Sequence, residues 1–75
     1  MTEEEFIIKL YLLGFVSLNN KLIGMSHRLY FKHLTVIIYT NNSIRYTYKG
    51  LYVIPINKDK ELTLSIILKK LKEIT

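Results

Sequence analysis

Several residue types are scarce or absent in this chain of 75 residues, and each absence narrows what the protein can be. There is no cysteine, so neither a disulfide nor a thiolate metal site can form, which fits a reducing compartment. No apolar run approaches the roughly 20 residues that a transmembrane helix needs. The first residues, Met-Thr followed by three glutamates, are the opposite of a basic targeting leader. We therefore expect a cytoplasmic protein without a membrane partner, folded as a single domain over residues 1–75.

Acidic residues are missing from the whole middle of the chain. The 53 residues between Glu5 and Asp59 contain no Asp or Glu, and all six acidic residues lie near the two ends. The cations of the same stretch are Lys9, Lys21, Arg28, Lys32, Arg45, Lys49 and Lys58. The local positive field therefore exceeds what the formal net charge of +5 suggests. Such a field attracts either a phosphate backbone or an acidic protein partner, and charge alone does not choose between them.

The beginning of the chain predicts a helix. Thr2 and Glu5 have the spacing of a capping box, in which each side chain bonds to the free backbone amide of the other residue. Apolar residues follow at helical spacing, and Gly14 stands where a left-handed C-terminal cap is favoured. The apolar stripe consists of Phe6, Ile7, Leu10, Tyr11 and Leu13. We expect a helix over residues 3–13, whose three glutamates complement the positive end of the helix dipole.

The middle of the chain, from Phe15 onward, alternates with a period of two and is rich in β-branched and aromatic residues. Turn residues interrupt it at 19–20, 24–26, 41–43 and Gly50, which predicts a meander of short antiparallel strands. The clearest strand covers residues 44–49. One of its faces should pack, and this face carries Ile44, Tyr46 and Tyr48. The other face should be wet and basic, and it carries Arg45, Thr47 and Lys49.

Two further segments are expected in the sheet. Residues 27–33 repeat the alternation, with Leu29 and Phe31 on the face opposite to Arg28, Tyr30 and Lys32. The pattern slips near His33, where we expect a bulge or a bend. Residues 51–56 are apolar on both faces, and Pro55 indicates that this segment lies at a sheet edge or leaves the sheet there.

The last segment predicts a second helix. Its apolar stripe consists of Leu64, Ile67, Leu68, Leu71 and Ile74. Thr63 is the expected N-cap, and Lys69, Lys70 and Lys72 lie outside the stripe. The whole pattern predicts an α+β domain of two layers: a helix, three or four antiparallel strands and a helix, with both helices on one face of the sheet.

Few side chains of this sequence could act in catalysis. His27 and His33 are the only side chains that titrate near neutral pH, and neither has an acidic residue nearby in sequence. This excludes paired-carboxylate hydrolysis and leaves too few ligands for a metal, and no glycine-rich phosphate loop exists, so we expect no metal and no cofactor. A histidine among cations can move the proton of a ribose 2′-hydroxyl, which restricts the chemistry to RNA. Either histidine can equally be an ordinary surface or turn residue.

Tyrosines alternate along the expected strands. Tyr30, Tyr46 and Tyr48 could stack on nucleic-acid bases, and they could equally be core or cross-strand partners.

Six short motifs stand out along the chain: Gly14-Phe15, Gly24-Met25-Ser26-His27, Leu29 to His33, Val53-Ile54-Pro55, Lys60-Glu61-Leu62 and Thr63 to Lys69. Together they resemble motifs of the HicA-like (YcfA-like) mRNA interferases, the toxins of toxin-antitoxin pairs, whose fold is like that of a double-stranded RNA-binding domain. The resemblance implies that His27 is the catalytic histidine, that RNA is the substrate and that an antitoxin protein is a partner. Residues 34–50 are longer than the corresponding link in the family, enough to add a hairpin.

Three hypotheses follow for function. The first is an RNA-cleaving toxin that uses His27 as general acid or base. The second is a nucleic-acid binder without catalysis, in which cations contact phosphates and a tyrosine stacks on a base. The residues proposed for binding are Arg28, Tyr30, Lys32, Arg45 and Lys49. The third is a small phage-type inhibitor whose positive middle docks an acidic host protein.

Overall fold

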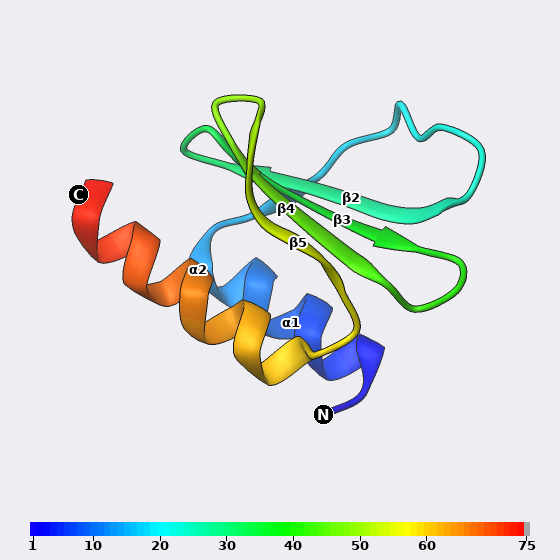
Figure 1. The fold of residues 1–75 in the computed structure, drawn as a ribbon, viewed down its shortest axis with the longest axis horizontal. Helices are drawn as coiled ribbons and strands as arrows, with labels where there is room; N and C mark the ends of the chain where they lie inside the picture. The colour runs from blue at the N-terminus through cyan, green and yellow to red at the C-terminus, as the bar shows by residue number, and fades with distance from the viewer. Residues whose placement is uncertain (75) are drawn as a thin grey trace.

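A computed structural model describes residues 1–74, with the side chains of all of them except residues 52–56. Seven elements follow one another: α1 (Glu3–Leu13), β1 (Val16–Ser17), β2 (Met25–Phe31), β3 (Leu34–Tyr39), β4 (Ile44–Tyr48), β5 (Leu51–Asn57) and α2 (Lys60–Ile74). The strands form one antiparallel sheet in the order β1-β2-β3-β4-β5 (Figure 1). The predicted α+β class and the antiparallel meander are confirmed, with the two-residue strand β1 added at one edge.

The first helix has the predicted bounds and caps. Thr2 Oγ1 accepts a hydrogen bond from the backbone amide of Glu5, and the Glu5 carboxylate accepts one from the amide of Thr2. Gly14 ends the helix with a φ of 111°, in the region that favours glycine. Its backbone amide donates to the Tyr11 carbonyl. The capping box and the glycine cap are both confirmed.

The register of the sheet decides which side chains share a face. His27 pairs with Ile38, Arg28 with Ile37 and Leu29 with Val36. Across the next strand pair, Ile38, Ile37 and Val36 align with Ile44, Arg45 and Tyr46. Because directly paired residues point to the same face and neighbours point to opposite faces, these rows alternate between the two sides of the sheet.

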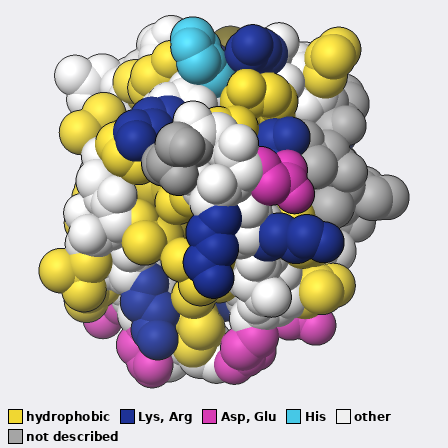
Figure 2. Space-filling model, turned by 90° about the vertical axis from the view of Figure 1, so that its left-hand side faces the viewer, with side chains coloured by type: hydrophobic (Ala, Val, Ile, Leu, Met, Phe, Trp, Pro, Cys, Tyr) yellow, Lys and Arg dark blue, Asp and Glu magenta, His cyan; other side chains and the backbone are white. Residues whose placement is uncertain are grey.

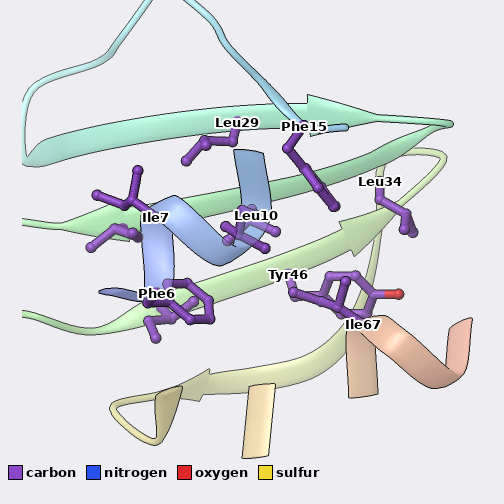
Figure 3. Close-up of a cluster of buried hydrophobic side chains, with 11 residues drawn as sticks. Phe6, Ile7, Leu10, Phe15, Leu29, Leu34, Tyr46 and Ile67 are labelled. Carbon is purple, nitrogen blue, oxygen red and sulfur yellow. The ribbon is translucent and has the colours of Figure 1, made fainter. Parts of the chain in front are cut away.

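The core fills the space between the sheet and the helices. In Figure 1 both helices lie on the same side of the sheet. Buried apolar side chains from α1, α2, strands β2 to β4 and the link between α1 and β1 form a single cluster there (Figure 3). Its members are Phe6, Ile7, Leu10, Phe15, Leu29, Leu34, Val36, Ile38, Ile44, Tyr46 and Ile67. The predicted packing of Ile44 and Tyr46 is confirmed, and Tyr48 packs partly buried against the cluster.

Two tight hairpin turns close the same end of the sheet. Phe31 pairs with Leu34, so Lys32 and His33 form a two-residue turn with φ of 49° and 69°. The expected bulge or bend near His33 is therefore wrong: the chain reverses there, in the geometry of a type I′ turn. Lys49 and Gly50 make the second turn, with φ of 54° and 82°. Within residues 34–50, β3 and β4 form an antiparallel hairpin.

The second helix begins three residues before the predicted N-cap. Asp59 Oδ1 accepts the backbone amide of Leu62 at 2.9 Å, so Asp59 and not Thr63 caps the helix. Thr63 is fully buried, and its hydroxyl donates to the Asp59 carbonyl at 2.8 Å. Of the predicted stripe only Ile67 is fully buried, whereas Leu68 is 41% exposed. Apolar residues surround much of this helix, so periodicity alone did not locate the face that packs.

Two predictions concern the sheet edge and the membrane. β5 lies at the edge of the sheet, as Pro55 indicated. The expected apolar character of both faces of residues 51–56 falls largely outside the described side chains. Among the described residues, no helix is both long and apolar enough to cross a membrane.

Candidate nucleic-acid interface

The side of the sheet away from the helices carries a row of two arginines. Arg28 of β2 and Arg45 of β4 both align with Ile37 of the central strand β3. Adjacent strands lie about 4.8 Å apart, so the two arginine backbones are about 10 Å from each other. We call this surface the open sheet face. Its residues are Arg28, Tyr30, Thr35, Ile37, Tyr39, Arg45 and Thr47.

Both arginines are held against the sheet. Arg28 Nη1 donates to the Asn20 carbonyl at 3.2 Å, which ties the guanidinium to the loop between β1 and β2. The Arg45 guanidinium carbon lies 5.8 Å from the centre of the Tyr39 ring, within the range of a cation–π contact. Neither side chain is fully exposed. Preorganised cations lose less rotamer entropy on meeting an anion than free ones do.

Two side chains on the open sheet face are buried although no helix covers them. Ile37 is only 9% exposed and Thr47 only 8%, although Figure 1 shows no helix on this side of the sheet. Tyr30 is 37% exposed and is more accessible than Tyr39, the other aromatic residue named on this face. The prediction that Thr47 lies on a wet face is therefore wrong, since the residue is buried.

The two tight turns place further cations at one end of the sheet. Lys32, His33 and Lys49 are all exposed, and the Lys49 amide donates to the His33 carbonyl at 2.9 Å, so the two turns lie side by side. All three residues have positive φ, which costs a residue with a side chain roughly 1–2 kcal/mol. Strain of this kind is typical of functional positions.

Aromatic rings support the cations at this end. Lys32 Nζ lies 5.3 Å from the Phe31 ring centre. The Tyr48 ring has Lys49 Nζ at 5.3 Å and Lys70 Nζ of α2 at 4.4 Å. We call Lys32, His33, Lys49 and Lys70 the hairpin end. Figure 2 looks at this end and shows a histidine beside Lys and Arg side chains at the top, with acidic side chains mainly at the bottom.

His27 lies elsewhere. It belongs to the row of Ile38, which faces the helices, whereas Arg28 faces away from them. His27 Nε2 is 3.4 Å from Glu3 Oε1, in the first turn of α1. The two side chains line a shallow depression together with Glu4, Ile7 and Ile8. The imidazole therefore has carboxylates around it, and no cation is among the described residues that line this depression.

The structure thus divides the predicted site residues into three places. Arg28, Tyr30 and Arg45 share the open sheet face, and Lys32 and Lys49 meet at the hairpin end, while His27 lies near α1. Sequence reasoning missed Glu3, Tyr39 and Lys70, and it named His33 only as a candidate histidine without a binding role. Glu3 and Lys70 are distant in sequence from the residues they contact, so no local spacing could have indicated them. The strict alternation of β2 could have separated His27 from Arg28.

The described part of the site offers no set of metal ligands. Among the described residues, no three side chains of His, Asp or Glu gather into a possible ligand set. Comparison of the chain with models of protein families, with curated proteins and with solved structures finds no match. The resemblance to mRNA interferases therefore remains a prediction from short motifs.

Proposed function

We propose that this protein binds single-stranded RNA along the open sheet face and the hairpin end. One observation carries the proposal: the two layers of the fold differ in charge. All six acidic residues belong to the helices or to the cap of α2, and the strands and their turns contain none. A polyanion that approaches the sheet side therefore meets arginine and lysine without a competing carboxylate from the strands.

The contacts available suit a single strand. Arg28, Arg45, Lys32 and Lys49 can neutralise phosphates, which supplies affinity but no sequence preference. Tyr30 presents an accessible ring on which a base can stack, a contact worth about 1–3 kcal/mol and tolerant of sequence. The bases of a duplex are already stacked on one another, so they cannot use this ring. RNA rather than DNA follows from the resemblance to the mRNA interferases.

Cleavage by His27 is the second candidate, and one contact favours it. Glu3 Oε1 lies 3.4 Å from His27 Nε2, and a carboxylate this close to an imidazole can help to hold the ring in place for general acid–base catalysis. Of the cations proposed for binding, Arg28 and Arg45 lie on the opposite face of the sheet, and Lys32 and Lys49 lie at the hairpin end. The surroundings of His27 therefore support binding without cleavage better than they support catalysis.

The binding proposal is tested by measuring affinity for a labelled single-stranded RNA between about 50 and about 200 mM salt. With four phosphate contacts, the logarithm of the affinity should fall with the logarithm of the salt concentration at a slope of about −3. Lys49→Asn should reduce that slope by about 0.7 and keep the turn, since Asn accepts positive φ. The matched control is Lys69→Gln, on the outer side of α2, which should leave the slope unchanged.

Single-stranded DNA, duplex RNA and an acidic protein are the alternative partners, and each predicts a different result. Equal affinity for single-stranded DNA would remove the preference for RNA, and tighter binding to duplex RNA would contradict the role of Tyr30. Affinity that is absent or independent of salt would contradict the proposal. Capture of one acidic protein, with no nucleic acid bound, would instead support the host-protein inhibitor.

A further inference from the structure

An open depression of about 600 Å³ lies at the end of the sheet opposite to the hairpin end. Its walls come from the end of the loop before β2, the turn between β3 and β4, and the link between β5 and α2, which Figure 1 shows at the right-hand end of the molecule. We call it the turn pocket. Its polar and charged walls include Thr40, Asn41, Ser43, Arg45, Asn57 and Lys58. The volume is within the roughly 300–1,000 Å³ of typical small-molecule sites.

The charges of the turn pocket are positive. Arg45 and Lys58 line it, and no acidic side chain is among its described lining residues. Asp59 follows Lys58 in the chain but turns toward α2, where its Oδ1 accepts the backbone amide of Leu62 at 2.9 Å. An anion in the pocket would therefore meet two cations without a competing carboxylate from the described walls.

The turn that forms one wall is held by its own hydrogen bonds. Asn41 Oδ1 accepts the Ser43 backbone amide at 3.0 Å and the Ser43 hydroxyl at 2.6 Å. Both lone pairs of this oxygen are thereby used, so Asn41 offers a ligand only the N–H donors of its side-chain amide. The Thr40 amide donates to the Gly24 carbonyl at 2.9 Å and joins the turn to the loop before β2. The wall is therefore preorganised, which lowers the entropy cost of binding.

Arg45 belongs both to the turn pocket and to the open sheet face. Its guanidinium lies 5.8 Å from the centre of the Tyr39 ring, and Tyr39 also lines the pocket. A guanidinium is planar, and its fork of N–H groups can bind two oxygens of one phosphate group. The turn pocket is therefore continuous with the open sheet face, and a strand that lies along this face has its end at the pocket.

The composition of the pocket indicates the charge of its ligand. A phosphodiester within a strand carries a single negative charge, whereas a phosphate monoester carries about −1.5 to −2 at neutral pH. Two cations and the amide donors of one pocket match the more highly charged group. We propose that the turn pocket binds a phosphate monoester, at the end of an RNA strand or on a free mononucleotide. Binding of a strand end rests on the proposed function, because the strand would reach the pocket along the open sheet face.

The first test uses adenosine 5′-monophosphate (AMP) and adenosine as probes, titrated into isotope-labelled protein and followed by NMR. AMP should bind at least about tenfold more tightly than adenosine, because charge-assisted hydrogen bonds form only with the phosphate. The backbone amide signals that shift should include those of Ser43 and Lys58, and those of Lys32 and Lys49 at the hairpin end should not move. AMP that binds no better than adenosine, or that shifts only the hairpin end, would overturn the proposal.

The second test changes the charge of the pocket with almost no change of shape. Asn41→Asp keeps the oxygen that accepts both hydrogen bonds of Ser43, so the turn should be retained, but it adds a carboxylate to the wall. AMP affinity should fall about tenfold or more, because like charges then meet in the pocket. Asn42→Asp is the matched control, since Asn42 is not among the described lining residues and its φ of 69° is one that aspartate accepts. Equal weakening by the two variants would contradict the proposal.

A second pair of variants serves if the turn does not tolerate a charge. Lys58→Gln removes one of the two cations and should weaken AMP binding about tenfold. Lys60→Gln is its control, because Lys60 lies two residues further along and is not among the described lining residues. Unchanged AMP affinity in Lys58→Gln would likewise count against the pocket.

The third test separates the two sources of the monoester. Short single-stranded RNAs of one sequence are compared with a phosphate at the 5′ end, at the 3′ end or at neither end. If a strand ends in the pocket, one phosphorylated form should bind about tenfold more tightly than the hydroxyl form, and Lys58→Gln should remove only that difference. Equal affinity of the three RNAs, with AMP still bound in the pocket, would identify the free mononucleotide as the ligand.

The same measurements show which of the two proposals fails. Salt-dependent binding of hydroxyl-ended RNA, together with equal affinities for AMP and adenosine, would support the open sheet face and exclude the pocket. AMP bound in the pocket by a protein that does not bind hydroxyl-ended RNA would support the pocket and exclude the open sheet face.

Discussion

His27 and Arg28 are neighbours in sequence but lie on opposite faces of the sheet. The imidazole of His27 faces the helix layer and reaches Glu3 at 3.4 Å, while Arg28 faces outward and donates to Asn20. A catalytic site that needs a histidine beside a cation cannot use this pair without a change of backbone register. The relationship separates the proposed RNA-binding surface from His27, the histidine that the short motifs indicated.

His27→Ala should therefore leave RNA affinity unchanged. The pair with Glu3 is partly exposed, so its loss should cost no more than about 1 kcal/mol of folding stability. Anisotropy with labelled RNA and a denaturant titration of the same variant check both expectations. RNA that is degraded by the wild type and spared by His27→Ala would instead establish the cleavage hypothesis.

Replacing the turn residues Lys32 and His33 should stabilise the fold and weaken RNA binding. Replacing the pair by Asn-Gly suits a type I′ turn and should stabilise the fold by about 1–2 kcal/mol. The same change removes Lys32 and His33 from the hairpin end, so RNA affinity at low salt should fall and its salt slope should shrink by about 0.7. Asn42→Gly is the control: Asn42 has a φ of 69° in the turn between β3 and β4, at the other end of these strands. It should not weaken binding.

Tyr46→Phe should stabilise the protein. Tyr46 is fully buried, and its hydroxyl, visible in Figure 3, has no hydrogen-bond partner among the described residues. Removing a buried hydroxyl without a partner should raise the free energy of unfolding by about 1 kcal/mol. The midpoint of a denaturant titration measures this, and a lower midpoint in the variant would show that the hydroxyl has a partner in solution.

High pH should destabilise the wild type more than Tyr46→Phe. Burial, with smaller contributions from Glu73 and Tyr48, raises the pKa of Tyr46 from 10.0 to about 12. Between these values the unfolded chain loses the phenolic proton first, so stability is complete below pH 10 and declines as pH rises toward 12. The decline attributable to this tyrosine is about 3 kcal/mol. Parallel stability curves for the two proteins above pH 10 would contradict this expectation.

Gly14→Ala should destabilise the protein more than Gly50→Ala. Both glycines have positive φ, so either change costs about 1–2 kcal/mol in backbone strain. A Cβ at Gly14 would lie 2.9 Å from Phe31 Cε1, whereas one at Gly50 would meet open space. We expect a difference of about 1 kcal/mol between the two variants in thermal or denaturant unfolding. Equal losses would mean that the Phe31 ring moves aside freely.

Local patterns predicted much of the fold. The capping box of Thr2 and Glu5 and the glycine at position 14 gave the bounds of α1, because these signals act within one helical turn. The turn at Lys32 was missed because neither of its residues is Gly or Asn, the usual residues of that geometry. The N-cap of α2 was predicted at the wrong residue because threonine is a common N-cap, whereas Thr63 is a buried residue within the first turn of the helix.

The candidate site was harder to predict than the elements. The absence of acid between Glu5 and Asp59 correctly indicated a sheet without carboxylates, since this depends on sequence alone. Contacts such as Glu3 with His27, or Lys70 with Tyr48, depend on how the helices pack, and no periodicity contains that information.

The placement of both helices on one side of the sheet has a consequence for how freely the sequence can change. The core cluster takes its strand residues from the face that meets α1 and α2, and none of the residues of the open sheet face belongs to it. Substitutions on the outward face can therefore alter what the protein binds with little change in folding stability. Binding preference and stability can then evolve almost separately.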